Sequence, residues 1–186
     1  MCQQAVKEKR DSYKSIHLYF QDESRFGMFT KNGRALTVKG VKPICPFQQV
    51  FKSTYLFGAF SPITGDKFLL EYPNCNADIF ELFLNELSKE NSTELKVMVV
   101  DNAAFHKAKK IKIPDNIILI FQPPYSPEVN PAEQIWAWYK RAFTNRIYKS
   151  IPQIVEFISN KSENLTKELV KSITRQEYIF SNYWTF

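Results

Sequence analysis

Apolar and polar residues follow one another in patterns that predict strands in the first half of the chain and helices in its last third. Residues 16–21 alternate with a period of two, as expected for a strand with one buried face, and Asp22 ends this run. Residues 26–30 are expected to form its partner after a tight turn. Residues 49–60 and 67–72 are rich in aromatic and β-branched residues and are joined by a turn-forming segment, so they predict a hairpin.

The second half of the chain mixes helical and strand patterns. Asn76 is placed to cap a helix whose apolar stripe has helical spacing, made of Ile79, Phe80, Phe83, Leu84 and Leu87. Two nearly continuous apolar runs, 95–100 and 116–121, predict strands covered on both faces, with a short helix at 102–112 between them. Helical patterns follow at 130–146, 151–159 and 165–173. Together these elements predict one mixed α/β domain over residues 16–186, preceded by a frayed polar tail at 1–15.

Composition excludes several classes of protein. The 186 residues include sixteen phenylalanines, nine tyrosines and three tryptophans, enough for a substantial core without disulfides or a structural metal. The three cysteines are widely spaced and have no histidine in metal-ligand register, which favours reduced intracellular thiols. No apolar stretch is long enough to cross a membrane, and the N-terminus is too polar for a signal peptide. We therefore expect a cytoplasmic protein.

Three acidic residues stand where a metal site can be assembled. Asp22 and Asp101 each follow a predicted strand, and Glu133 lies in the first turn of a predicted helix. Each also has a structural explanation, because aspartates form turns and cap helices, and Asn130 with Glu133 resembles a capping box. As a set they point to chemistry. Three clustered carboxylates need cations to remain charged, and hard cations with oxygen ligands suit phosphoryl transfer.

Positive charge is concentrated beside these acids. The net charge of +6 favours polyanionic partners. Basic residues follow Asp101 and also share the helix face of Glu133, and the candidates for phosphate contacts are Lys107, Lys109, Lys110, Lys140 and Arg141. A solvated helix face is the ordinary explanation for such a run. Its position next to the acids favours DNA as the partner, with the protein associated with the nucleoid.

Three motifs occur in a recognisable order. They are the pair Asp22-Glu23 after the first strand, the pair Asp101-Asn102 after the second motif strand, and Asn130-Pro131-Ala132-Glu133 after a proline-rich segment at 123–127. Over residues 16–160 the chain resembles the DDE transposases of the mariner superfamily, including its bacterial insertion-sequence members. The 31 residues between Asp101 and Glu133 are slightly fewer than in many members.

The resemblance implies an RNase H-like fold, with a mixed five-stranded sheet flanked by helices. It implies that Asp22, Asp101 and Glu133 hold two Mg²⁺ or Mn²⁺ ions, with Asp22 rather than Glu23 as the first acid. The expected reaction is cleavage of transposon-end DNA and transfer of its 3′-hydroxyl into target DNA, carried out by a homodimer. Asn102 and His106 are expected to orient water or phosphate around the ions. Family members carry a helix-turn-helix domain for end recognition, which nothing before Ile16 is expected to supply.

Two other functions stay open at this point. A truncated or domesticated transposase would bind DNA or inhibit transposition without catalysis, although an intact acidic triad argues against decay. Another RNase H-like nuclease would act on RNA–DNA hybrids or Holliday junctions. Enzymes of that kind usually add a fourth carboxylate and lack the proline-rich segment before Glu133.

Overall fold

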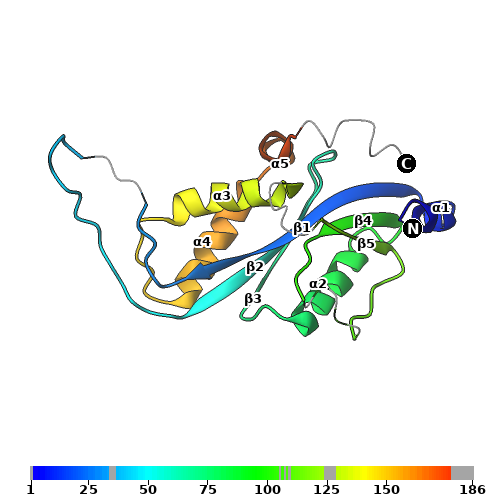
Figure 1. The fold of residues 1–186 in the computed structure, drawn as a ribbon, viewed down its shortest axis with the longest axis horizontal. Helices are drawn as coiled ribbons and strands as arrows, with labels where there is room; N and C mark the ends of the chain where they lie inside the picture. The colour runs from blue at the N-terminus through cyan, green and yellow to red at the C-terminus, as the bar shows by residue number, and fades with distance from the viewer. Residues whose placement is uncertain are drawn as a thin grey trace.

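A computed structural model describes residues 2–33, 37–104, 106, 108, 110–123 and 129–176, and its centre is a mixed five-stranded sheet (Figure 1). The strands are β1 (Ser15–Gly27), β2 (Ser53–Phe60), β3 (Lys67–Tyr72), β4 (Glu94–Val100) and β5 (Ile117–Phe121). Their order in the sheet is β3-β2-β1-β4-β5. The first three strands are antiparallel, whereas β1, β4 and β5 are parallel. The predicted five-stranded α/β sheet is confirmed.

Helices cover both faces of this sheet. They are α1 (Cys2–Arg10), α2 (Ala77–Lys89), α3 (Ala132–Phe143), α4 (Ile151–Glu163) and α5 (Lys167–Thr174). On one face α2 packs over a cluster that includes Tyr19, Phe57 and Met98. On the other, the helices α3 to α5 pack over a cluster that includes Phe26 and Phe60. Alternation along β1 therefore sends successive side chains to different helical layers.

The central strand is longer than the sequence pattern predicts. β1 runs through to Gly27, so residues 26 and 27 continue the first strand and do not begin a partner strand. Its pairing with β4 extends from Ser15 to Phe20, and its pairing with β2 from Phe20 to Gly27. Beyond Phe20, β1 therefore leaves the side of β4. That divergence opens space next to Asp22.

Within the expected polar N-terminal tail or linker at 1–15, residues 2–10 form the helix α1 and not a frayed end. α1 is polar except for a few positions, but Val6 is buried against Leu18, Phe20, Val97 and Val99 of the sheet. One apolar contact of this kind is enough to dock a short helix built of good helix formers. It is too little to give a recognisable helical pattern.

The expected helix at 102–112 is also absent from the described residues of that segment, which form turns. The side chain of Asp101 accepts a hydrogen bond from the backbone N–H of Ala103 over 2.8 Å, a local bond that competes with helix formation. Backbone bonds from His106 to Ala103 and from Ile111 to Ala108 close single turns. The crossover between β4 and β5 is thus irregular.

The remaining helices confirm the sequence patterns with shifted ends. Asn76 caps α2 by accepting the backbone N–H of Ile79 over 3.0 Å. α3 stops at Phe143 rather than near residue 146, and α4 continues to Glu163. In the described part of the chain, no helix combines the length and the apolar character needed to span a bilayer.

A long connection between β1 and β2 extends away from the sheet (Figure 1). We call its described residues, 28–33 and 37–52, the arm. Its base is a short ladder in which the N–H of Met28 bonds the carbonyl of Lys52 over 2.9 Å and the N–H of Thr30 bonds the carbonyl of Gln48 over 3.0 Å. The side chain of Gln48 also donates to the carbonyl of Tyr148 over 3.0 Å. The base of the arm is therefore fixed against the helical layer.

Candidate active site

Asp22 lies in the middle of β1, on the face covered by α3. The indole Nε1 of Trp136 donates a hydrogen bond to Asp22 Oδ2 over 2.8 Å. Desolvation, together with the charges of Glu23 and Glu133, raises the pKa of Asp22 to about 8 against the opposing hydrogen bonds. A carboxyl with a pKa near 8 and two acidic neighbours is poised to accept a positively charged ligand.

Gly58 makes room for this arrangement. It lies directly opposite Asp22 in the β1–β2 ladder. A Cβ atom at position 58 would lie 2.8 Å from the indole of Trp136 and 2.6 Å from the ring of Phe60. Because real Cβ contacts are essentially never under 3.0 Å, only glycine fits beneath the indole in this packing.

Glu133 is exposed in the first turn of α3, and one side chain ties this turn to the sheet. Asn130 Nδ2 donates to the carbonyl of Gln21 over 3.0 Å, and its Oδ1 accepts the N–H of Ala132 over 3.0 Å. The N-cap position of α3 is Pro131 rather than the expected Asn130, and Asn130 instead joins the start of α3 to β1. Asn130 bonds Gln21, the residue that precedes Asp22 on β1. One side-chain amide therefore positions the two segments that carry Asp22 and Glu133.

Asp101 follows β4, the parallel neighbour of β1. The paired register of β1 and β4 ends at Phe20 and Val99, and Asp22 and Asp101 each come two residues after this last pair. The side chain of Asp101 is 48% exposed, and its Oδ1 accepts hydrogen bonds from the N–H of Ala103 and from His106 Nδ1, the latter over 2.7 Å.

His106 bridges two acids. Its Nε2 lies 3.1 Å from Glu23 Oε1, while its Nδ1 bonds Asp101. Burial by itself lowers the pKa of His106, but the hydrogen bonds and charges of Glu23 and Asp101 outweigh it and raise the pKa. Gln21 also donates to Glu23 over 2.7 Å. Glu23 is therefore linked to Asp101 through the imidazole of His106.

Asp22 and Glu133 line one open pocket of about 420 Å³. Its other lining residues are Glu23, Ser24, Arg25, Lys31, Trp136, Ala137 and Lys140. Asp101 is not among them. Within the described ranges, no three histidine, cysteine or acidic side chains come close enough to hold one ion together. The structure therefore brings two of the three predicted acids to one pocket and places the third on the neighbouring strand.

The other predicted residues have varied surroundings. Asn102 donates its amide to the carbonyl of Gln122, which ties the end of β4 to the end of β5. Lys110 is exposed and pairs with Asp78 over 2.6 Å. Arg141 is exposed on α3. Lys107 and Lys109 lie outside the described residues.

Lys140 is more enclosed than a simple surface cation. Its Nζ donates to the carbonyl of Arg25 and lies 3.8 Å from the centre of the Phe26 ring. Desolvation, together with the charges of Lys31 and Arg25, lowers the pKa of Lys140 to about 8. Neither the cation cluster around Lys140 nor the role of Trp136 was found from the sequence. Arg25 and Lys31 are far from Lys140 in the chain, and no short motif joins them.

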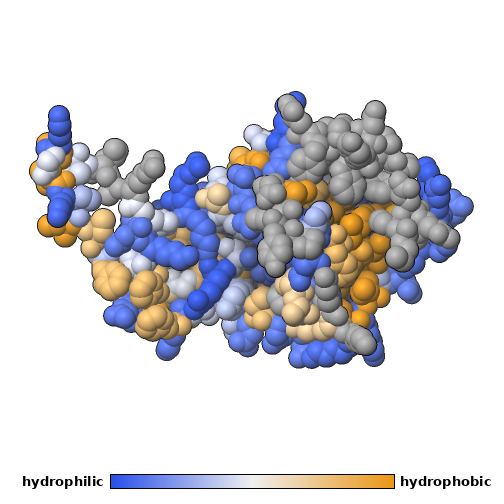
Figure 2. Space-filling view, in the orientation of Figure 1, coloured by the Kyte–Doolittle hydropathy of each residue, from blue (hydrophilic) through white to orange (hydrophobic). Residues whose placement is uncertain are grey.

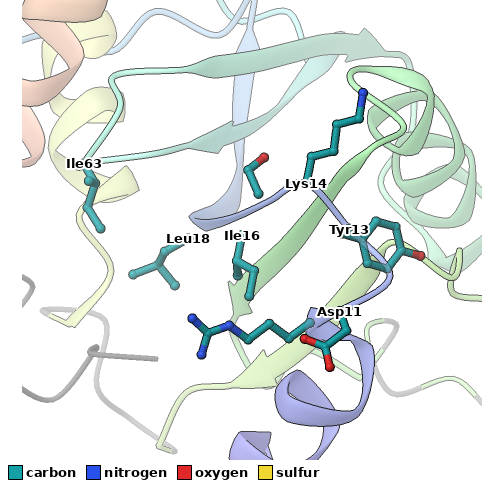
Figure 3. A pocket seen from close by; sticks show the side chains of 8 residues that line it. Asp11, Tyr13, Lys14, Ile16, Leu18 and Ile63 are labelled. Atoms are coloured by element: carbon teal, nitrogen blue, oxygen red, sulfur yellow. The ribbon is translucent and has the colours of Figure 1, made fainter.

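A larger pocket, of about 550 Å³, lies near the start of β1 (Figure 3). Its lining residues are Arg10, Asp11, Tyr13, Lys14, Ser15, Ile16, Leu18 and Ile63. Leu18 is four residues before Asp22, about 13 Å along the strand. This pocket contains none of the three predicted acids, so we place the candidate site at the smaller pocket beside Asp22.

Comparison with known protein families shows to which family this chain belongs. The sequence profile of the family described as DDE superfamily endonuclease matches residues 17–155, an interval that contains all three acids. The chain belongs to this family. A relative from Sinorhizobium fredii, the uncharacterized protein y4pE/y4sA, is 37% identical over 103 residues, which are 54% of this chain and 76% of the relative.

Solved structures of the Mos1 mariner transposase are similar in fold. The paired-end complex with the left transposon end has a TM-score of 0.65 and 15% identity, covering 93% of this chain and 55% of that chain. The paired-end complex with Mg has a TM-score of 0.67 and 14% identity, covering 93% and 56%. The one with Mn gives 0.65 and 16%, with the same coverage. This member of the DDE family therefore has the RNase H-like fold that the resemblance implied, and it spans about 55% of the length of the Mos1 chain.

Proposed function

We propose that this chain is the catalytic domain of a DNA transposase that cleaves transposon-end DNA and joins the freed 3′-hydroxyl to target DNA. Asp22, Asp101 and Glu133 are the catalytic acids. The observation that carries the proposal is the meeting of Asp22 and Glu133, distant in the sequence, at one pocket where their charges act on each other. Membership of an endonuclease family and a fold shared with Mos1 support it.

The side chains of the site fit divalent cations of the Mg²⁺ or Mn²⁺ type. Carboxylate oxygens are the donors that such hard ions prefer. The raised pKa of Asp22 has the charges of Glu23 and Glu133 among its causes, and these are the charges that bound cations would offset. When bound, two such ions supply Lewis-acid stabilisation of the attacking and leaving oxygens.

The protein's own groups then have defined tasks. Trp136 fixes one oxygen of Asp22, and Asn130 fixes the turn that carries Glu133. His106 bonds one oxygen of Asp101, and Glu23 bonds the other nitrogen of the same imidazole. The proposal requires the Asp101 side chain to turn toward the pocket from its neighbouring strand. Phosphodiester cleavage needs no covalent intermediate with the protein in this scheme, because water and then the 3′-hydroxyl are the nucleophiles.

The proposal extends to partners. Mos1 has been solved as a paired-end complex with a transposon end, so we propose DNA as the partner of this chain and a homodimer as the working assembly. A cytoplasmic, nucleoid-associated location follows from that partner. These statements concern the whole transposase, of which this chain corresponds to about half the Mos1 length.

The direct test measures metal binding and cleavage separately. Wild type, Asp22→Asn, Asp101→Asn and Glu133→Gln are compared for Mn²⁺-induced thermal stabilisation and for nicking of supercoiled plasmid. Binding of an ion to the folded state alone raises the melting temperature. We expect wild type to show both effects and each variant to lose at least about 100-fold in nicking. Glu163→Gln, an exposed acid at the end of α4, is the control and should behave as wild type.

One observation favours a non-catalytic DNA-binding role instead. Asp101 does not line the pocket that Asp22 and Glu133 share. If wild type binds DNA but shows neither Mn²⁺-induced stabilisation nor nicking, that role replaces the proposed one. Stabilisation that persists in all three acid variants would likewise reject the triad as the metal site.

A further inference from the structure

A second, basic pocket adjoins the acidic one. It has a volume of about 270 Å³ and lies between the arm and the end of α3. Four cationic and three aromatic side chains line it, together with Gly27 and Val50, namely Arg25, Lys31, Lys52, Lys140, Phe29, Phe51 and Phe143. We call it the basic–aromatic pocket. Because Arg25, Lys31 and Lys140 also line the acidic pocket, the two cavities share a wall.

The cations of this pocket have no acidic partner in the described part of the chain, where the ion pairs involve other residues. Arg25 Nε donates instead to the hydroxyl of Ser53 over 2.9 Å. Lys140 donates to the carbonyl of Arg25. Positive charge is thus gathered in a pocket whose own lining contains no acidic residue, and the nearest acids belong to the adjoining pocket of Asp22. An anionic ligand would relieve the repulsion among these groups.

The pocket is also held in shape. The ladder between Met28 and Lys52 fixes both sides of the arm where the pocket opens. The carbonyl of Lys31 accepts the N–H of Asn145, which follows α3, over 3.1 Å. Lys31 and Lys52 are therefore carried on backbone that is bonded to the helical layer and to the opposite side of the arm. A site that is formed in advance loses less conformational entropy on binding.

Exposed aromatic rings surround the opening. Phe51 is 72% exposed and Phe47 is 59% exposed. The ring of Phe29 lies 5.4 Å from that of Phe51 and 5.6 Å from that of Phe47. Figure 2 shows apolar residues among hydrophilic ones on this side of the molecule. Aromatic rings next to a cationic groove are the usual platform for unpaired nucleic acid, because bases stack on the rings while cations follow the phosphates.

We propose that the basic–aromatic pocket binds an unpaired segment of DNA next to the phosphate that is cut, an inference that rests on the proposed function. Arg25, Lys31 and Lys52 take the phosphates, and a base stacks on Phe51 and Phe29. The size of the pocket is near the lower end of small-ligand sites, about 300 Å³, so it takes one nucleotide unit rather than a duplex. The shared wall then leads the strand from this pocket to Asp22.

The test is DNA binding in EDTA, where no cleavage occurs. Fluorescence anisotropy measures the affinity for a labelled single-stranded oligonucleotide and for a hairpin duplex of the same length, at several salt concentrations. The variants are Phe51→Ala and the double variant Lys31→Ala/Lys52→Ala. The matched control is Lys39→Ala/Lys42→Ala, which removes two exposed lysines of the same arm that do not line the pocket.

Each variant has a distinct expected signature. Lys31→Ala/Lys52→Ala should weaken single-strand binding about tenfold or more and lower the salt slope by about 1.4, which is two phosphate contacts. Phe51→Ala should weaken single-strand binding by about 5- to 100-fold without changing that slope, and leave the duplex nearly unaffected. Equal losses in the control pair, or equal losses for duplex and single strand in Phe51→Ala, would overturn the proposal. So would unchanged single-strand binding in Phe51→Ala.

The experiments distinguish an error in the proposed DNA pocket from an error in the proposed transposase function. Mn²⁺-induced stabilisation of the single variant Lys52→Ala should equal that of wild type, since Lys52 does not line the pocket of Asp22 and Glu133. Single-strand binding that follows the pattern above without any plasmid nicking supports the pocket and rejects the transposase chemistry. Nicking without that pattern supports the chemistry and rejects the pocket.

Discussion

Trp136 donates its indole N–H to Asp22 across 2.8 Å, and this bond joins the helix that carries the third acid to the strand that carries the first. The bond stabilises the charged form of Asp22 against the desolvation that raises its pKa. It also restricts the rotation of the carboxyl, since one oxygen is fixed. The other oxygen is then presented in a defined direction, which is what a metal ligand requires.

Trp136→Phe should keep most of the packing and lose this donor. Without the hydrogen bond the pKa of Asp22 rises further, so fewer molecules carry the ionised carboxylate that a cation needs. We expect the affinity for Mn²⁺ at pH 7, measured by isothermal titration calorimetry, to fall about 10-fold, the value of a hydrogen bond to a charged group. Trp138→Phe is the matched control, because Trp138 packs on Tyr139 and Lys161. Equal losses in both variants would contradict a specific role for Trp136.

Gly58→Ala should move the indole. The added Cβ would lie 2.8 Å from Trp136, and the clash costs about 1–3 kcal/mol of unfolding free energy, as overpacking usually does. Thermal unfolding and tryptophan fluorescence should both change. Gly27→Ala provides the comparison within the same sheet, because a Cβ there would meet its nearest atom, the carbonyl oxygen of Lys52, at 3.4 Å. A Gly58→Ala protein with wild-type stability and unchanged fluorescence would contradict the prediction, because Trp136 and Phe60 would then have made room for the Cβ without cost.

Asp22→Asn should stabilise the metal-free protein at neutral pH. The folded pKa of about 8 lies above the ordinary 3.8, so the folded state holds a proton that the unfolded state releases between these values. Stability is therefore unaffected below pH 4 and falls as the pH rises toward 8. In EDTA at pH 7 the variant should be more stable by about 1–4 kcal/mol, with no difference at pH 4. Chemical denaturation at both pH values measures this. A variant less stable than wild type at pH 7 would contradict the prediction.

His106→Ala should loosen Asp101 without unfolding the sheet. The imidazole bonds both Asp101 and Glu23, and removal of a group that orients a metal ligand usually costs about 10- to 100-fold in affinity or activity. Mn²⁺ affinity and plasmid nicking are the measurements, with circular dichroism to establish folding. Addition of free imidazole should restore part of the loss. Wild-type Mn²⁺ affinity in the variant would show that His106 serves packing alone.

Much of the sheet could be predicted from the sequence because its signals are local. The runs that became β4 and β5 are apolar on both faces, and the hairpin of β2 and β3 has its turn residues between two strand patterns. The extension of β1 had no such signal. Its polar stretch Asp22–Glu23–Ser24–Arg25 breaks the apolar alternation where the strand passes the acidic pocket. Because these site residues are polar, the sequence pattern did not show that the strand continues through them.

The candidate acids and His106 were named from motifs, but the bond of Trp136 to Asp22 and that of His106 to Glu23 were not predicted. Trp136 bonds Asp22, and His106 bonds Glu23, only because tertiary packing brings these residues together. The same holds for the cluster of Arg25, Lys31 and Lys140. The docking of α1 depends on one buried valine, Val6, in a polar segment. Contacts of this kind leave no periodic trace in the sequence.

The two hydrogen bonds of Asn130 have a consequence for how this protein tolerates change. These bonds tie the first turn of α3, which carries Glu133, to the backbone of Gln21 next to Asp22. This link is independent of the peptide that connects β4 to α3. Because one side chain makes both bonds, the position of Glu133 relative to β1 depends on Asn130 as well as on the length of that connecting peptide.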